Sequence, residues 1–406
     1  MKILLVNQVF YPDEISVSQH MSDFACDCVA AGHQIDVIAG DSNYENPQIR
    51  YLPAETWNTI SIKRLSSTRF TKKSLLGRLI NFITFNFNLF FRLICKVSKK
   101  YDVVIASTVP PMIGIFTAVA CLLKRRPFVY WIMDLQPDEA IAAGILKSSS
   151  MPARLFSALS MLPLKQAQLI VVLDRFMKER IIKKKISPNK IAVIPPWPVI
   201  LSEKYSDEGR TRFRDEHGFG NRLVVLYSGN HSICHPLDTF INAVISLKDD
   251  PRFLFVSIGG GVRVKDVEKA INDHQLKNLI RLPFQPRERL NDSLCAADVH
   301  VVVMGDPFVG IVHPNKQYSS MALGIPFLFV GPKQSHLGDI IDQTHCGFQI
   351  EHGDDGGCVK VLRSFAAMNQ QELRGMGSRG IQFVKQVVDR SVTSKVLVTH
   401  LENLQH

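Results

Sequence analysis

Short, continuously apolar segments alternate along this chain with stretches in which apolar residues recur every three or four positions. In the first half we predict strands over residues 3–9, 35–39, 103–107, 128–133, 169–173 and 191–194, and a helix over 17–31 that Gly32 ends. The strand segments lack polar alternation, as expected of parallel strands that helices cover on both faces. This order of elements predicts a doubly wound α/β domain.

A proline-rich stretch at residues 195–198 interrupts this pattern, and a charged stretch over 203–214 follows it. Prolines cannot donate hydrogen bonds into a sheet, so we interpret this region as a connection between domains. A second series of strands is predicted over residues 223–227, 253–258, 279–282, 299–303 and 326–330. The predicted fold class is therefore α/β, with two tandem Rossmann-like doubly wound domains over residues 1–200 and 201–385, and a C-terminal helix over 386–406.

The composition is that of an ordinary globular protein, with 406 residues, 46% hydrophobic and 21% charged, and it excludes disordered and collagen-like chains. The net charge of +11 lies in the first half. Residues 1–200 hold 25 basic and 14 acidic side chains, whereas residues 201–406 hold 23 of each. Such an excess favours nucleic acid, an anionic membrane surface or a phosphorylated molecule as partner. The basic residues are not interleaved with aromatic ones, which disfavours nucleic acid.

The eight cysteines include no CxxC pair and fall mostly in apolar segments, which favours free thiols in a reducing compartment. The N-terminal apolar run over residues 3–6 is too short for a signal peptide and has no small-residue cleavage site after it. We therefore predict a cytoplasmic location.

The most apolar stretch, residues 79–94, is shorter than the roughly 20 residues that a membrane-spanning helix needs. As a helix it has one polar stripe, an otherwise Leu, Ile and Phe surface, and cations at both ends. Two interpretations remain open at this point. The helix packs on a sheet, or it lies in an anionic membrane interface with Phe87, Phe90, Phe91 and Arg92 at the lipid.

Three loops of the second half follow predicted strands, where ligands of open α/β sheets bind. The first, residues 228–236, contains Gly229, and its His231, Cys234 and His235 resemble metal ligands but lack a fourth, so we expect no metal. The second is a run of three glycines over 259–261, without a dinucleotide fingerprint.

The third loop, residues 312–326, carries the strongest signal. Pro314 fits the start of a helix and Gly324 its end, which places Lys316 in the first turn. A cation is unfavourable there unless an anion binds, so the pattern favours a phosphate site.

Carboxylates follow two strands of the first half. Asp13 and Glu14 come after the first strand, and Asp134 and Glu139 come after the strand over 128–133. Asp134 is placed either to face a ligand or to cap a helix, and the sequence leaves both interpretations open.

At these residues the chain resembles the GT-B-fold glycosyltransferases of family 4, in particular the branch that builds bacterial surface polysaccharides. The matching segments occur in family order and include KILLVNQVFYPDE, YWIMDLQPDEAIAAGIL, VVLYSGNHSICHPLDTFINA and PNKQYSSMALGIPFL. The resemblance implies that the first domain binds an acceptor, the second binds a nucleotide-sugar donor, and C-terminal helices cross back to the first domain. It also implies retention of anomeric configuration without a metal or another cofactor.

Residue roles follow from the resemblance. The implied catalytic residues are Lys316, Asp134 and His235, and the implied acceptor-binding residues are Asp13, Glu14, Ser16 and Glu139. The implied donor-binding residues are Gly229, Asn230, His231, Gly260, Phe284, Gln285, Pro314, Asn315, Lys316 and Ser319.

Two pairs of residues depart from the family pattern. Asn230 and His235 stand where an arginine and a lysine are common, and Ile311 and Ser319 stand where paired glutamates are common.

The expected function is transfer of a hexosyl-type sugar to a membrane-bound lipid-linked or glycan acceptor, at the inner face of the cell membrane. Expected partners are a nucleotide-sugar, a lipid-linked saccharide, an anionic membrane and other polysaccharide assembly enzymes. A nucleotide-sugar epimerase or hydrolase on the same fold, and a non-catalytic nucleotide-sugar-binding scaffold, are the alternatives.

Overall fold

The computed structural model describes residues 1–44, 46–68, 70, 75–96, 101–198 and 205–405. The chain divides into two compact units. Unit 1 comprises Met1–Val199, Gly310–His313 and Arg390–His406, and unit 2 comprises Ile200–Val309 and Pro314–Asp389. Each unit contains a parallel sheet covered by helices, so the predicted pair of α/β domains is confirmed.

The sheet of unit 1 has the strand order β3-β4-β2-β1-β5-β6-β7-β8. All neighbouring strands are parallel except β3, which forms an antiparallel hairpin with β4 that the sequence did not predict. The strand order reverses between β1 and β5, and ligands of such sheets bind beside this point. The strands are β1 Lys2–Val6, β2 Gln34–Gly40, β3 Ala54–Trp57, β4 Ile60–Leu65, β5 Val103–Ala106, β6 Phe128–Trp131, β7 Leu169–Val172 and β8 Ile191–Val193.

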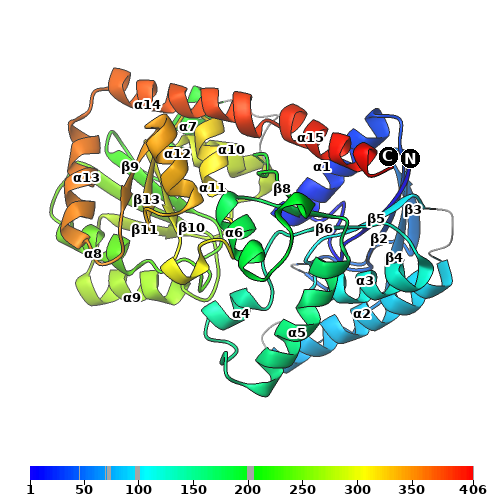
Figure 1. Ribbon diagram of the computed structural model, residues 1–406. Coiled ribbons are helices and arrows are strands. Elements are labelled where there is room, and N and C mark those ends of the chain that lie inside the picture. The colour runs from blue at the N-terminus through cyan, green and yellow to red at the C-terminus, as the bar shows by residue number, and fades with distance from the viewer. Residues whose placement is uncertain (45, 69, 71–74, 97–100, 199–204, 406) are drawn as a thin grey trace. The chain divides into compact units, whose positions relative to one another are not determined.

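The helices of unit 1 form two groups (Figure 1). α1 packs against α15, and Leu397 and Leu401 of α15 share one core with Ile3 and Leu5 of β1. In the other group, α3 packs against both α2 and α5. The helices are α1 Ser16–Ala30, α2 Leu75–Lys96, α3 Ile113–Lys124, α4 Asp138–Ala142, α5 Met151–Gln166, α6 Arg175–Lys183 and α15 Arg390–Glu402.

The sheet of unit 2 is parallel throughout, with the order β11-β10-β9-β12-β13-β14 and its reversal between β9 and β12. Its strands are β9 Leu223–Ser228, β10 Phe253–Ile258, β11 Leu279–Leu282, β12 Val299–Val303, β13 Phe327–Val330 and β14 Gly347–Ile350, the last of which was not predicted. Its helices are α7 Asp207–Glu216, α8 Asp238–Ser246, α9 Val264–His274, α10 Arg287–Cys295, α11 Lys316–Ala322, α12 His336–Thr344, α13 Asp355–Ala367 and α14 Gln370–Phe383.

Strand β9 shows why its sequence is continuously apolar. Val225 and Tyr227 belong to a core that includes residues of α8 and α13. Val224 and Leu226 belong to a second core, with residues of α7 and α10. Both faces of the strand are therefore buried, as the sequence pattern predicted.

Two of the predicted domain limits are corrected. Unit 2 continues to Asp389 rather than 385, because α14 extends through a π-helical turn over Val384–Val388 that stays packed on α11. Residues Gly310–His313, predicted within the second domain, belong to unit 1. There, Leu135 donates a backbone hydrogen bond to the carbonyl oxygen of Ile311 at 2.9 Å, and His313 contacts Asp174 at 2.8 Å.

All eight cysteines are free, in agreement with the sequence. Among the described residues, no helix combines the length and the apolar character needed to cross a membrane.

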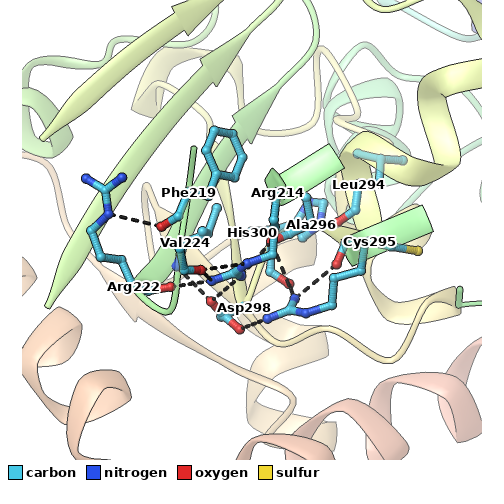
Figure 2. A network of polar contacts seen from close by, with 12 residues as sticks. Arg214, Phe219, Arg222, Val224, Leu294, Cys295, Ala296, Asp298 and His300 are labelled. Carbon is cyan, nitrogen blue, oxygen red and sulfur yellow. Dashed lines mark hydrogen bonds and ion pairs between the residues drawn. The ribbon is translucent and has the colours of Figure 1, made fainter. Parts of the chain in front are cut away.

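A network of arginines fastens α7 to the sheet of unit 2 (Figure 2). Arg214, buried on α7, donates to the carbonyl oxygens of Arg222 at 2.6 Å and Ala296 at 3.0 Å, and to Asp298 at 3.2 Å. Arg210 donates to the other carboxylate oxygen of Asp298 at 2.6 Å, and Asp298 also accepts a bond from the Val224 backbone at 2.7 Å. The network therefore satisfies polar groups at the start of β9 and β12.

We predict that Arg214→Met lowers the free energy of unfolding of unit 2 by about 3 kcal/mol, because it leaves buried carbonyl oxygens without a donor and removes one of Asp298's two cations. Urea unfolding followed by fluorescence measures the change. Arg252→Met is the matched control, since Arg252 is exposed and pairs with Asp250 at the surface. It should shift the midpoint much less. Equal shifts for both variants would contradict the assigned role of the network.

Candidate functional site

Two glycine-containing loops of unit 2 meet at the carboxyl ends of β9 and β10. Gly229, Gly259 and Gly261 all have positive φ, at +122°, +129° and +132°. A Cβ atom on Gly259 would clash with the carbonyl group of Gly229, and one on Gly261 would clash with the Asn230 side chain. Only glycine permits both this backbone conformation and this close approach. The predicted loop residues are therefore brought together.

Lys316 is the first residue of α11 and extends over these loops. Its Cε would lie 2.9 Å from a Cβ on Gly229, its Nζ lies 3.8 Å from the centre of the Tyr227 ring, and it donates to the Asn230 carbonyl oxygen at 3.3 Å. Within the described part of the chain it has no carboxylate partner. Burial disfavours the charged form and lowers the pKa of Lys316 to about 7. A bound anion would reverse this penalty.

The two loop histidines are neutral at pH 7. His231 is buried, with one ring nitrogen 3.1 Å from the Gly229 carbonyl oxygen and the other 2.8 Å from Ser257 Oγ. Burial, together with the charge of Lys316, lowers the pKa to about 4 for His231 and to about 3 for His235. Among the described residues, Nδ1 of His235 has no hydrogen-bond partner. Because both nitrogens of His231 are engaged, the loop does not present the three metal-ligand side chains considered from the sequence.

The remaining predicted donor-binding residues lie at the start of α11 and in the loop after β11. Pro314 precedes α11 rather than starting it, because Asn315 is the N-cap and the helix begins at Lys316. Ser319 lies on the same helix, half-buried. Phe284 is exposed and would contact a Cβ on Gly260, whereas Gln285 donates to the carbonyl oxygen of Pro283 at 3.0 Å.

Two residues of this region were not identified from the sequence. Tyr227, which places its ring beneath the Lys316 ammonium, was classed only as part of a strand. Gln317 is fully buried on α11, and neither polar atom of its amide has a hydrogen-bond partner among the described residues. The sequence could have indicated Gln317 only through its position, as a polar residue next to Lys316 in a helix of seven residues.

The predicted acceptor residues after β1 have structural partners. Asp13 is buried, and its Oδ1 accepts hydrogen bonds from Asn43 Nδ2 and Tyr44 N, both at 2.8 Å, and from the Tyr51 hydroxyl at 3.1 Å. Glu14 is exposed, and Ser16 begins α1 with its Oγ 3.3 Å from Nδ1 of His20. Asp13 therefore organises the loop after β2.

Asp134 and Glu139 form an electrostatically coupled pair beyond the end of β6. Burial, reinforced for Asp134 by the nearby Glu139 charge, raises the pKa of both carboxyl groups. The Asp134 backbone donates to Thr108 Oγ1 at 3.3 Å. Asp134 is not a helix N-cap, since Pro137 occupies that position of α4. The pair can hold a proton near neutral pH.

The residues predicted to meet a membrane divide between two sides of α2. Phe87 and Phe91 are about half exposed, whereas Phe90 lies 6.0 Å from the ring of Phe116 on α3. Arg92 is half-buried. The cations predicted at the two ends of this helix lie partly outside the described residues.

Residues 17–197, most of unit 1, match the family model of the glycosyl transferase 4-like domain. This part of the chain is a glycosyl transferase 4-like domain. The probable glycosyltransferase WbjE of Pseudomonas aeruginosa is 25% identical over 280 residues, which cover 69% of this chain and 70% of WbjE. The putative colanic acid biosynthesis glycosyl transferase WcaI of Escherichia coli K12 is 23% identical over 353 residues, which cover 84% of this chain and 86% of WcaI.

Among solved structures, HepE of Anabaena in complex with UDP-glucose superposes with a TM-score of 0.73 at 16% identity, over 99% of this chain and 100% of HepE. That likeness shows the GT-B fold. The glycosyltransferase resemblance and the fold class predicted from the sequence are thus confirmed.

We predict that the affinity of the Lys316 site for a diphosphate diester, with UDP-glucose as the test compound, falls about tenfold between pH 6 and pH 8. Lys316, with its pKa of about 7, is protonated at pH 6 and largely neutral at pH 8, and only the protonated fraction attracts a diphosphate. The diphosphate diester of UDP-glucose does not titrate in this range. Isothermal titration calorimetry at each pH gives the dissociation constants. Lys316→Arg is the control, because arginine stays charged, and its affinity should be flat. A parallel fall in both proteins would contradict the role of Lys316.

Proposed function

We propose that this glycosyltransferase moves a hexosyl-type sugar from a nucleoside-diphosphate donor to a membrane-bound lipid-linked or glycan acceptor. The reaction proceeds with retention and without a metal, in polysaccharide or glycoconjugate biosynthesis. Unit 2 binds the donor and unit 1 binds the acceptor. The protein is cytoplasmic and associates peripherally with the inner face of the cell membrane, beside other polysaccharide assembly enzymes.

The position of Lys316 is the observation that carries this proposal. An ammonium group with no carboxylate partner among the described residues lies over the glycine loops at the β9–β12 reversal. Cleavage of a glycosyl phosphate develops negative charge on the departing diphosphate, and a preorganised cation stabilises that charge most in a site of low polarity. Lys316 is thus proposed to bind the diphosphate and to stabilise it as leaving group.

Metal independence is supported by the chemistry of the proposed donor residues. They are glycines, amides, histidines, a proline, a phenylalanine, a serine and Lys316, and none offers the carboxylate oxygen that Mg²⁺ prefers. The ammonium group supplies charge in its place. The proposal of retention comes from the family resemblance.

We assign supporting roles to the other predicted catalytic groups. The coupled Asp134–Glu139 pair, with its raised pKa values, is suited to take up or hold the proton of an acceptor hydroxyl. His235 is neutral, and its unpartnered Nδ1 can exchange one hydrogen bond with the donor sugar or phosphate.

An exposed apolar ridge on α2 supports membrane association. Leu79, Ile83, Phe87 and Phe91 follow one another at four-residue spacing, and each is about half exposed. Their spacing places them on one side of the helix. The opposite side, with Phe85, Leu89 and Leu93, is buried. One face of α2 is therefore packed inward, and the open apolar face supports the proposed membrane contact.

Neighbouring helices extend the apolar surface. Leu122 and Leu123 of α3 and Met151 and Leu155 of α5 are exposed, and the cations Lys124, Arg125 and Arg154 accompany them. Exposed apolar side chains among cations fit an anionic bilayer, with chains in the interface and charges at the headgroups.

We predict that Lys316→Ala lowers sugar transfer at least about 100-fold while the melting temperature changes little, because a charge that stabilises the leaving group is lost. Thermal shift with UDP-, GDP- and dTDP-sugars first selects the donor. Transfer of radiolabelled sugar from that donor into the lipid extract of bacterial membranes then measures activity. Lys269→Ala, at an exposed lysine of α9, is the control and should transfer normally. Undiminished turnover in Lys316→Ala would refute the leaving-group role, and a donor-induced shift without any sugar transfer would favour the non-catalytic nucleotide-sugar-binding scaffold.

We predict that replacing Ile83, Phe87 and Phe91 together by serine abolishes flotation of the protein with anionic liposomes, because the ridge supplies the apolar contact. Phe90 is left intact, since it packs on Phe116. The control replaces three exposed apolar residues of other elements, Leu52, Val262 and Val396, by serine. If both triple variants float like the native protein, the ridge is not the membrane contact.

A further inference from the structure

Unit 1 contains a cavity of about 190 Å³ that the predicted acceptor residues do not line. It lies beyond the carboxyl ends of β1, β2 and β4 and against the first half of α2, and its lining includes Gln8, Gly40, Ser42, Ser67 and Phe82. Gly40 makes room for it. A Cβ on Gly40 would lie 3.3 Å from Cγ of Gln8, so glycine at the end of β2 lets the glutamine side chain pass.

Hydrogen bonds on two sides of the cavity hold its walls in place. On one side, two of the three hydrogen bonds that Asp13 accepts fix Asn43 and Tyr44, which belong to the lining. On the other side, Asn81 exchanges two 3.0 Å hydrogen bonds with the backbone of Phe70. The cavity is therefore preformed, and Asp13 acts as a positioning residue for its wall.

Three polar side chains of the lining can form hydrogen bonds to a ligand. Oε1 of Gln8 is buried without a partner in the described structure. Ser42 and Ser67 are half-buried lining residues whose hydroxyl groups can donate and accept. Buried polar groups are nearly always paired, so the open amide oxygen of Gln8 indicates a ligand that supplies a donor, and the two serines offer that ligand further hydrogen bonds.

The lining also restricts the chemical class of that ligand. Its described side chains are neutral, so a carboxylate or phosphate placed there would lose hydration without meeting a cation. Tyr44 and Phe82 add aromatic surface to the amide and hydroxyl groups. The volume is below the roughly 300–1,000 Å³ of sites that enclose whole drug-sized ligands, which indicates a single ring.

We propose that this cavity binds a neutral sugar ring of the acceptor, which rests on the proposed function. α2 joins the cavity to the apolar ridge, because Asn81 and Phe82 line the cavity while Leu79 and Ile83 belong to the ridge. The same turn of α2 thus contributes to the surface proposed to contact lipid and to the cavity proposed to contact saccharide (Figure 1 shows α2). An acceptor with lipid and sugar portions matches this arrangement.

Saturation-transfer NMR on the full-length protein tests the proposal, with methyl glucoside, methyl galactoside and methyl glucuronide as probes. The nucleotide chosen by thermal shift is added in excess to occupy the donor site. We expect a neutral glycoside to bind and the glucuronide not to bind. Gln8→Ala and Ser67→Ala should each weaken binding about five- to tenfold, the usual effect of one lost hydrogen bond. Ser66→Ala, at the exposed neighbouring serine, should leave it unchanged.

A cavity-filling variant gives a second readout that does not depend on monosaccharide affinity. Ser67→Phe should reduce transfer to the lipid extract at least tenfold, with the thermal shift by the donor preserved, whereas Ser66→Phe should transfer normally. Equal transfer by both variants, or equal binding of glucuronide and neutral glycosides, would overturn the proposal. If Ser67→Phe binds the donor and transfers sugar normally, only the role of this cavity is refuted. If the native protein does not bind any donor, the proposed function itself is refuted.

Discussion

The donor-side loops of unit 2 depend on a close contact between two backbone segments, at Gly229 and Gly259. A residue larger than glycine could not be accommodated at this contact. Because Gly229 has no side chain, the stem of Lys316 can lie directly on it, with its ammonium group over the ring of Tyr227. The cation is consequently held by a carbonyl oxygen and an aromatic face instead of a carboxylate. Such a site retains most of the electrostatic attraction of Lys316 for an incoming anion.

Other partly buried cations of the protein are compensated differently. Arg214 is paired with Asp298 and carbonyl oxygens, and Arg390 is paired with Asp23 and Asp27 in unit 1. These arginines serve the fold, because their charge is already neutralised by the chain. Lys316 is desolvated without a carboxylate partner among the described residues. Its lowered pKa reflects the free energy that desolvation of the charged form requires. An uncompensated buried charge is typical of a functional site rather than of a structural one.

The sequence predicted those features that depend on local patterns. Continuous apolar runs such as residues 253–258 predicted buried parallel strands, and the Pro314 and Gly324 punctuation placed Lys316 in a first helical turn. The β3–β4 hairpin was missed because its turn uses Asn58 and Thr59 at positive φ, and threonine is an unusual residue there. Tertiary contacts were not accessible from the sequence, so the contacts by which Asp13 supports a loop were not predicted, and Tyr227 and Gln317 were not identified.

The distribution of charge in unit 1 gains a physical meaning from these contacts. The basic excess of residues 1–200 does not line the described part of the small cavity, whose side chains are neutral. Exposed cations instead accompany apolar residues on α3 and α5. Long-range attraction to an anionic surface tolerates imprecise geometry, whereas selection of one sugar ring requires fixed, uncharged hydrogen-bonding groups. Under the proposed function, separate positions for the two kinds of group would let unit 1 attract a membrane without making the proposed saccharide site attractive to every anion.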